Sequence, residues 1–405
     1  MQRHQRPILV TLLGVMTVAA AAAEWHQWRG PARDGISSET GLLEQWPEGG
    51  PEQVFEVEGL GAGYSSFAFA GDLLFTQGQY DSKQYLMAFN RKTGDMAWEG
   101  EHGSIYTDRR GSGPRGTPVI DGDRVYASGG DGNLVCAKHA TGDVVWQVNL
   151  LDRFGGSNIR WGISESPLID GDQLVANAGG PGAGVVALNK MTGKLIWKSQ
   201  SDEAGYSSAI PAEIGGVRMY VLLTGEAAIG VRADNGELLW RYEAVSNRTA
   251  NIATPIVTGN QVFVSSDYGT GCALLQLNPQ GGGVQAEEVY FSRDMRNHYS
   301  SSVLVDGYLY GYSSRILTAM KLETGEVAWR DRAVGKGQVI YADGRLYMLG
   351  EDGVVGMAKA TPEGYQEISR FEIGRGDFPT WTLPAINDGL LYLRDQDVLM
   401  AYRIR

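Results

Sequence analysis

Cations and aromatic residues of this chain gather on polar stretches that each end just before a short apolar run. The set comprises Arg109, Arg110, Arg115, Arg153, Arg160, Arg293, Arg296, His298, Lys336 and Arg375, with Trp161 and Trp381 beside them. Arginine offers a forked pair of donors for a carboxylate, a sulfate or sugar hydroxyls, and tryptophan offers a flat apolar face. Together they suit a binding site for an anion or a sugar, provided that the fold brings the stretches together.

The sequence lacks the patterns of the common catalytic and metal chemistries. Its five histidines are scattered, so no metal-ligand spacing appears, and neither G-x-S-x-G nor H-E-x-x-H occurs. We therefore assign no catalytic residue and no metal ligand.

The first 23 residues have the pattern of a secretory signal peptide. Arg3 and Arg6 precede an apolar run from Ile8 to Ala20, and three alanines follow up to Ala23. The apolar run is shorter than the roughly 20 residues that span a membrane. We expect cleavage near Ala23, a periplasmic or secreted protein, and no membrane span.

The net charge of the chain excludes some partners. It is −12 for the full sequence and becomes −14 once the two arginines of the leader are removed. So acidic a protein is a poor partner for nucleic acid or for an anionic membrane surface.

A short motif recurs along the chain and accounts for half of its tryptophans. Thr-Gly, or Asn-Gly in one copy, is followed four residues after the glycine by tryptophan, at Trp98, Trp146, Trp197, Trp240 and Trp329. A second marker is a glycine turn between two alternating apolar runs, which is typical of a β-hairpin. These turns contain Gly71, Gly122, Gly171, Gly215, Gly259, Gly307, Gly344 and Gly389. Eight hairpins indicate eight repeated units.

Each unit reads as a hairpin, a third strand, the Thr-Gly turn and a fourth strand, which is the blade of a β-propeller. No window of 12 residues sustains a helical period. We predict an all-β fold, a single eight-bladed propeller over residues 51–405, after an N-terminal extension of residues 24–50. The last unit is one strand short, so Gln53–Glu58 is expected to complete it and close the ring. The motif tryptophans are expected to dock neighbouring blades, each packing on the next blade's Thr-Gly turn.

The motif A-x-D-x-x-T-G-x-x-x-W is similar to the tryptophan-docking repeat of the PQQ-like propellers. The resemblance covers roughly residues 50–405, and residues 25–47 also resemble the start of secreted PQQ-binding-like repeat proteins. The chain matches the motif's alanine at Ala88, Ala187 and Ala319. It departs from the motif's aspartate at Asn90, Lys138, Asn189, Arg232 and Lys321. The fifth and seventh units lack the motif.

The resemblance implies the eight-bladed scaffold of quinoprotein alcohol dehydrogenases and of the propeller lipoprotein that serves outer-membrane assembly. Such dehydrogenases stack PQQ on a disulfide between adjacent cysteines, beside a calcium ion. Cys136 and Cys272 fall in the second and fifth units, too far apart for the roughly 7 Å that a disulfide allows. PQQ with calcium is therefore disfavoured as a cofactor, although a PQQ-dependent dehydrogenase stays the alternative function.

In a propeller, each link from an outer strand to the next inner strand crosses one face and ends beside the central channel. Seven residues near the ends of these links are expected to surround one channel mouth and bind a ligand: Arg115, Arg160, Trp161, Glu165, His298, Lys336 and Trp381. Glu165 would orient a hydroxyl or an arginine. The opposing interpretation is that acids on the same links pair with these arginines and plug the channel.

The function predicted from the sequence is that of a non-catalytic binding or scaffolding protein acting as a monomer. Its partner would be a carbohydrate, an anionic small molecule or a cell-envelope protein. An outer-membrane assembly scaffold is the second alternative.

Overall fold

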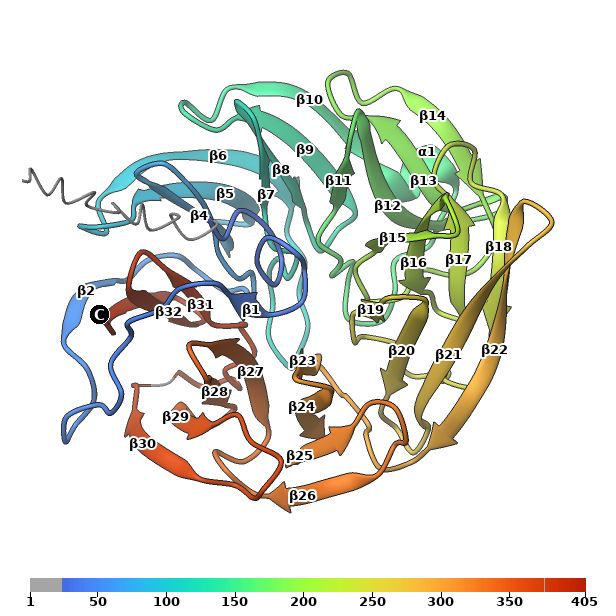
Figure 1. The fold of residues 1–405 in the computed structure, drawn as a ribbon. Helices are drawn as coiled ribbons and strands as arrows, with labels where there is room; N and C mark the ends of the chain where they lie inside the picture. The colour runs from blue at the N-terminus through green and yellow to red at the C-terminus, as the bar shows by residue number, and fades with distance from the viewer. Residues whose placement is uncertain (1–23, 375) are drawn as a thin grey trace, which may run out of the picture.

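Eight β-sheets stand around a central axis in the computed structural model, which describes residues 24–374 and 376–405 (Figure 1). The predicted signal peptide, residues 1–23, and Arg375 lie outside the described residues. Seven sheets have four strands and one has five. Within the described ranges the only helix is α1, Leu150–Phe154. The predicted eight-bladed, nearly helix-free propeller is therefore confirmed.

The strands occupy four positions in each blade, numbered outward from the axis. The innermost strands are β3 (Ala68–Ala70), β7 (Val119–Asp121), β11 (Leu168–Asp170), β15 (Ile210–Ile214), β19 (Ile256–Thr258), β23 (Val303–Val305), β27 (Gly337–Ala342) and β31 (Ala385–Asn387). The second strands are β4 (Leu73–Tyr80), β8 (Arg124–Ser128), β12 (Gln173–Gly180), β16 (Val217–Leu223), β20 (Gln261–Ser266), β24 (Tyr308–Ser313), β28 (Arg345–Gly350) and β32 (Leu390–Asp395). The third strands are β5 (Lys83–Asn90), β9 (Asn133–Lys138), β13 (Ala183–Asn189), β17 (Ala228–Arg232), β21 (Gly271–Gln280), β25 (Ile316–Lys321), β29 (Val354–Lys359) and β33 (Val398–Arg403). The outermost strands are β6 (Met96–Ser104), β10 (Val144–Asn149), β14 (Leu195–Ser199), β18 (Leu238–Tyr242), β22 (Gly283–Ser292), β26 (Val327–Asp331), β30 (Glu367–Glu372) and β2 (Gln53–Val57).

All eight predicted turn glycines join the first strand of a blade to the second. Each has a positive φ, from 54° at Gly259 to 80° at Gly307. Side chains disfavour this region of backbone space, so glycine lets the two strands turn tightly. The eight turn glycines identified in the sequence therefore predicted the number of blades correctly.

The ring is closed by strands from the two ends of the chain. β2 pairs antiparallel with β33, with Gln53 opposite Tyr402 and Val57 opposite Leu399. This confirms the predicted closure of the last blade. A second N-terminal strand, β1 (Ile36–Ser37), pairs in parallel with β27 and gives the seventh blade its fifth strand.

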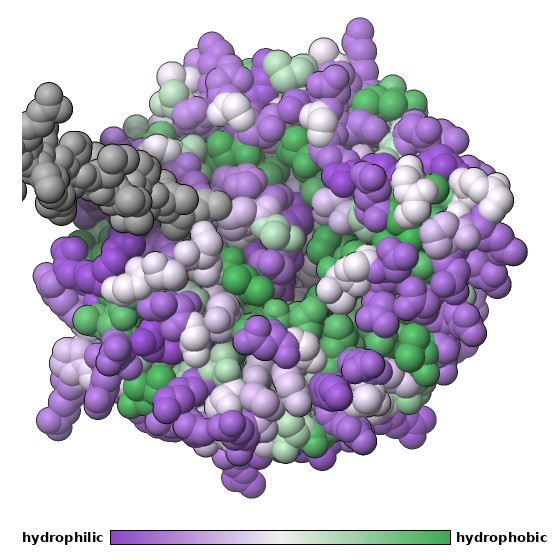
Figure 2. All heavy atoms as spheres, in the orientation of Figure 1, coloured by the Kyte–Doolittle hydropathy of each residue, from purple (hydrophilic) through white to green (hydrophobic). Residues whose placement is uncertain are grey.

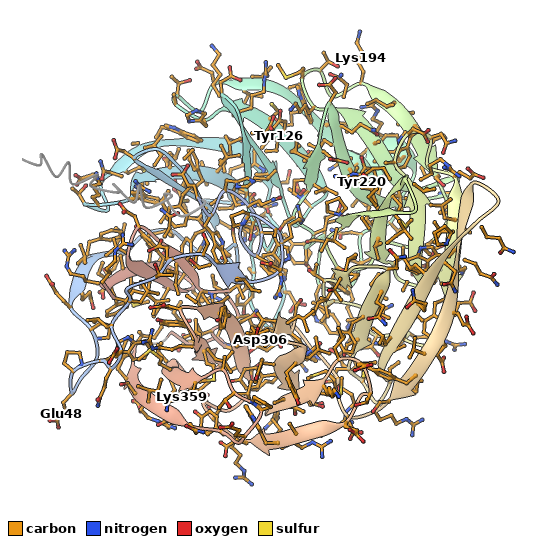
Figure 3. All side chains as sticks on the ribbon, viewed as in Figure 1. Glu48, Tyr126, Lys194, Tyr220, Asp306 and Lys359 are labelled. Carbon is orange, nitrogen blue, oxygen red and sulfur yellow. The ribbon has the colours of Figure 1, made fainter. Side chains whose placement is uncertain are left out.

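The hydrophobic core lies between neighbouring blades. Tyr126 packs between the second and third blades and Tyr220 between the third and fourth, whereas the exposed Lys194 and Glu48 project from the rim (Figure 3). Figure 2 shows mostly hydrophilic side chains on the outer rim and apolar ones beside the hollowed centre. Because each blade buries its faces against both neighbours, the ring positions its central links rigidly.

Four motif tryptophans reach across to the next blade. Their indole Nε1–H groups donate to backbone carbonyls there, over 3.0 Å from Trp98 to His139, 2.9 Å from Trp146 to Lys190, 3.0 Å from Trp197 to Ala233 and 2.8 Å from Trp329 to Thr361. The ring of Trp98 covers Gly142, where an added Cβ would lie 2.6 Å from it. The Thr-Gly turn thus supplies both the space and the curvature for docking.

The fourth and fifth blades dock differently. Trp240 packs among apolar residues of the fourth and fifth blades, but its Nε1 has no hydrogen-bond partner among the described residues. In the fifth blade, which lacks the motif, Tyr290 covers Gly325 of the next blade and donates its hydroxyl to the Leu322 carbonyl over 2.9 Å. Tyrosine therefore takes the tryptophan position at this interface.

Replacing Trp197 by alanine is expected to lower the free energy of unfolding by about 3–5 kcal/mol, since it empties a buried contact between blades. Thermal unfolding followed by circular dichroism measures the effect. Lys194→Ala, at an exposed position on the preceding turn, is the control and should leave the melting temperature unchanged. An equally stable Trp197→Ala protein would show that the docking contact does not stabilise the ring.

Candidate functional site

The N-terminal segment of residues 24–37, here called the plug, lies across the centre of the ring (Figure 1). Its backbone joins several blades. The Trp25 carbonyl accepts from the Phe69 N–H and the His26 carbonyl from the Ile120 N–H, each over 2.9 Å. The first part of the predicted extension, residues 24–37, is thus folded across the centre of the ring, whereas Glu48 near its end lies on the rim.

Two buried arginines fix the plug to opposite sides of the ring. Arg29 donates to the Ser302 carbonyl over 2.7 Å, and Arg33 donates to the carbonyls of Ser166 and Pro167 over 2.7 and 3.0 Å. Both side chains are about 1% exposed. Burial lowers the pKa of Arg29 to about 10 and that of Arg33 to about 9, so both stay charged at neutral pH.

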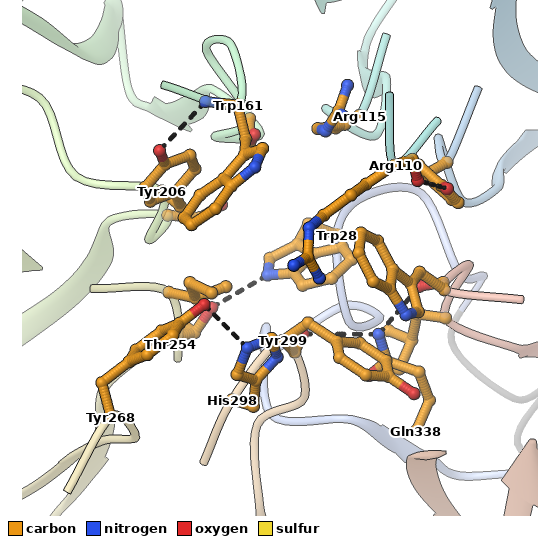
Figure 4. Close-up of a pocket in the computed structure, with 16 residues that line it drawn as sticks. Trp28, Arg110, Arg115, Trp161, Tyr206, Thr254, Tyr268, His298, Tyr299 and Gln338 are labelled. Atoms are coloured by element: carbon orange, nitrogen blue, oxygen red, sulfur yellow. Dashed lines mark hydrogen bonds between the residues drawn. The ribbon is translucent and has the colours of Figure 1, made fainter. Parts of the chain in front are cut away.

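A pocket opens beside the plug, and Trp28 of the plug lies at its centre (Figure 4). Its volume is about 880 Å³, including the space open to solvent at the mouth. Seven of the eight links between blades contribute to it, as the topology predicts. The lining residues are Trp28, Tyr64, Arg110, Arg115, Trp161, Ser164, Tyr206, Ser208, Ile252, Thr254, Tyr268, His298, Tyr299, Gln338, Trp381 and Leu383.

Aromatic rings form two walls of this pocket. On one side Trp381 lies between Tyr64 and Tyr299, with ring centroids 5.1 and 5.4 Å apart. On the other side Trp161 lies 5.9 Å from Tyr206, whose hydroxyl accepts a hydrogen bond from the Trp161 backbone N–H over 3.2 Å. These flat faces can stack against the apolar face of a sugar ring or against another planar ligand.

Tyr268 completes the lining from the loop between β20 and β21 and has a strained backbone. Its φ is +57°, a conformation that bulky residues rarely adopt. Its hydroxyl lies 2.9 Å from His298 Nε2. Burial, and then the charge of Lys336, lower the pKa of His298 to about 4, so the imidazole is neutral at pH 7. The positive φ belongs to the turn between β20 and β21, and the contact with His298 holds the Tyr268 ring at the pocket edge.

The pocket contains two guanidinium groups without carboxylate partners. Arg115 donates to the carbonyls of Gly111 and Gly113, each over 2.8 Å, and stacks on Tyr64 at 5.3 Å. The Arg110 side chain points into the pocket and makes no hydrogen bond or ion pair within the described ranges (Figure 4). No Asp or Glu is among the described residues of the lining. The charged side chains among the described residues of the lining are therefore arginines.

Four of the seven residues predicted for the site line the pocket: Arg115, Trp161, His298 and Trp381. Arg160 faces a neighbouring groove, with its guanidinium 4.9 Å from the Trp161 ring. Lys336 stands behind the lining, where it pairs with Glu351 over 2.9 Å and lies 4.9 Å from the Tyr299 ring.

Glu165, the seventh predicted residue, is buried away from the pocket. It is 2% exposed and accepts a hydrogen bond from the Asn177 backbone N–H over 2.5 Å. Burial raises its pKa to about 7, although this hydrogen bond and the charge of Arg33 act in the opposite direction. Glu165 thus belongs to the structure that fixes the plug.

Titration of Glu165 makes a testable contribution to stability. Its pKa is about 7 in the folded chain, against an ordinary value of 4.5. Protonated Glu165 therefore favours the folded state, and the stability that it contributes at low pH is lost as the pH rises from 4.5 to about 7. The melting temperature of the wild type is therefore expected to fall more than that of Glu165→Gln between about pH 5 and about pH 8. The amide keeps the acceptor oxygen but cannot ionise. Parallel curves for the two proteins would contradict this assignment.

Sequence reasoning missed Trp28 and Tyr268, and it counted Arg110 among the cations on the links but left it out of the predicted site. Trp28 lies outside the repeats, so blade topology could not place it, although its stretch stood out by resemblance. Tyr268 comes from a loop inside a blade rather than from a link. Arg110 lies on a predicted link but several residues from the inner strand, and a bend of that link brings it inward.

The residues present do not fit the calcium-and-PQQ centre of the related dehydrogenases. Cys136 in β9 and Cys272 in β21 are separate, buried free thiols. The described part of the chain contains no group of three or more His, Cys, Asp or Glu side chains that could hold a metal ion. No carboxylate of the described chain lines the pocket either, so the calcium ligands and the base of such a centre have no counterpart there.

Fold and pocket together define an eight-bladed propeller of the PQQ-like class. The sequence profile described as outer membrane protein assembly factor BamB matches residues 82–331, and the chain belongs to this family. Comparison with curated protein sequences gave no match. Over the described residues, no helix is both long and apolar enough to cross a membrane.

Solved structures share this fold at low sequence identity. BamB from Moraxella catarrhalis is 16% identical, with a TM-score of 0.63 over 87% of this chain and 98% of that one. The quinohemoprotein alcohol dehydrogenase from Comamonas testosteroni is 11% identical, with a TM-score of 0.66 over 94% and 80%. A europium-containing methanol dehydrogenase is 10% identical, with a TM-score of 0.65 over 92% and 89%. These similarities establish the fold alone.

Proposed function

We propose that this propeller is a non-catalytic binding protein of the periplasm or cell exterior that holds an acidic sugar, or a small anion like it, in the central pocket. One observation carries the proposal. Seven aromatic residues and two guanidinium groups, which have no carboxylate partner among the described residues, line one cavity. Aromatic faces stack on sugar rings, and a guanidinium binds a carboxylate or sulfate through two parallel donors.

The composition of the pocket supports binding rather than catalysis. Its titratable side chains are tyrosines, two arginines and His298, which is already bonded to Tyr268. No Asp, Glu, Cys or Lys of the described chain lines the pocket, so His298 has no acidic partner to orient it as a general base. The predicted signal peptide and the BamB family match support the location.

The proposal is tested by melting temperatures in a panel of ligands, because a ligand that binds the folded state raises the melting temperature. Galactose and galacturonic acid form a matched pair that differs by one carboxylate. Galacturonic acid should raise the melting temperature of the wild type more than galactose does, and Arg110→Ala should abolish the difference. An absence of any shift with galacturonic acid and sulfated sugars would overturn the proposal.

An envelope scaffold is the second candidate, and the match to the BamB family favours it. A scaffold should co-purify with membrane proteins from its native envelope, and substitution of pocket residues should not affect this.

A PQQ-dependent dehydrogenase is the remaining alternative. Such an enzyme would reduce a dye with alcohols after reconstitution with PQQ and calcium. We expect no turnover, because the pocket residues do not fit that centre. Stoichiometric quinone binding with turnover would overturn our proposal in favour of a dehydrogenase.

A further inference from the structure

A polar groove adjoins the pocket on the side of the third to fifth blades. It is lined by residues of three successive links and the loops beside them: Gly155, Ser157, Asn158, Ile159, Arg160, Gly179, Pro181, Ser201, Glu203, Ala204, Gly205, Tyr206, Gly225, Asn247, Arg248, Thr249, Ala250 and Asn251. Its volume, including open solvent, is about 1330 Å³. The groove is therefore at least as roomy as the pocket, and much more polar in its lining.

Tyr206 lines both the pocket and the groove, so the two spaces meet at this ring. Trp161 lines the pocket, and the neighbouring Arg160, which stacks on it, lines the groove. A ligand that fills the pocket against Trp161 thus lies next to the groove, with Tyr206 at the boundary.

The groove offers two arginine side chains that a ligand can bind. The exposed side chains of Arg160 and Arg248 make no hydrogen bond or ion pair with any described residue. Glu203 is the one carboxylate among the described residues that line the groove. With Arg110 and Arg115 of the pocket, the described lining of the two spaces contains four guanidinium groups and one carboxylate.

Hydrogen bonds hold the wall that carries Arg248 in place. Asn247 Oδ1 accepts from the backbone N–H groups of Thr249 and Ala250, each over 2.8 Å. Asn251 Nδ2 donates to the carbonyls of Thr224 and Gly225 over 3.0 and 2.9 Å. The groove is thus preformed, which reduces the entropy lost when a ligand binds.

We infer that the pocket and the groove bind one continuous ligand, an acidic oligosaccharide whose end lies in the pocket and whose following units lie in the groove. This inference rests on the proposed function. Sugar units with hydroxyls and carboxylates match a surface of serine, threonine, amide and separated arginine groups. A single-stranded nucleic acid is disfavoured, because its bases stack on aromatic side chains and Tyr206 is the one aromatic residue among the described residues that line the groove.

The inference is tested by isothermal titration of galacturonic acid and its oligomers of increasing length. The longest oligomer should bind the wild type at least about tenfold more tightly than the monomer does. Arg160→Ala/Arg248→Ala should remove most of this gain, while the affinity for the monomer changes by less than about twofold. Arg293→Ala is the matched control, because this exposed arginine lies on the next link but lines neither space.

The outcomes separate this inference from the function on which it rests. If no form of the sugar binds, the proposed function fails and the inference with it. If the monomer binds but length or the double variant has no effect, only the inference is overturned. Tighter binding of polyglutamate or of single-stranded DNA than of the oligomers would assign the groove to an acidic peptide or a nucleic acid and would also overturn it.

Discussion

Replacement of Arg33 by methionine is expected to lower the free energy of unfolding by about 2–6 kcal/mol, because two buried carbonyls lose their donor. The substitution strips the buried carbonyls of Ser166 and Pro167 of their donor. Each buried acceptor left unpaired costs about 1–3 kcal/mol. It also removes the cation that faces Glu165. Methionine fills much of the space of the arginine stem, so the loss measures hydrogen bonding and charge more than cavity formation.

Urea unfolding followed by tryptophan fluorescence measures this loss. Arg293→Met is the control, since an exposed arginine without partners among the described residues should change stability by no more than about 0.5 kcal/mol. Equal midpoints for Arg33→Met and the wild type would mean that the plug is not part of the folded ring. Trp28 would then have no fixed place in the pocket.

The combination of Trp161→Ala with Arg110→Ala is expected to weaken binding of the pocket ligand by about a hundredfold or more, because aromatic and arginine side chains at the centre of a site carry most of its binding energy. Neither side chain belongs to the motif tryptophans that dock neighbouring blades, so the melting temperature without ligand should stay close to that of the wild type. Isothermal titration with galacturonic acid measures the loss.

Phe378→Ala/Arg293→Ala is the matched control for this double variant, since it removes an exposed aromatic and an exposed arginine that lie on links of the same face but do not line the pocket. Unchanged affinity in the Trp161/Arg110 variant would mean that the ligand binds elsewhere. Unfolding of that variant would mean that these side chains plug the channel. Arg115 is the poorer choice for this test, because it also holds the carbonyls of Gly111 and Gly113.

The fold could be predicted from the sequence because its signals are local and repeated. A turn glycine such as Gly122 needs a positive φ, and the Thr-Gly turn at Gly142 leaves space for Trp98. Each signal depends on a few neighbouring residues, and eight copies average out the exceptions. The missing strand of the last blade then identified β2 as the closing strand.

The candidate site could be predicted only in part, because topology places a backbone position and local contacts orient the side chain. Trp161 and Trp381 precede inner strands and do face the pocket. Glu165 has the same position in the repeat, but the Asn177 N–H and the charge of Arg33 draw it into the interior. Trp28 depends on the plug folding back through the ring, which no repeat pattern encodes.

A crystal structure of the protein with galacturonic acid is the most direct test of the central claim, that the pocket binds an acidic sugar. We expect the sugar carboxylate within hydrogen-bonding distance of the Arg110 guanidinium and the sugar ring stacked on Trp161 or Trp381. An empty pocket at saturating sugar, or a sugar bound only on the outer face of a blade, would contradict the account.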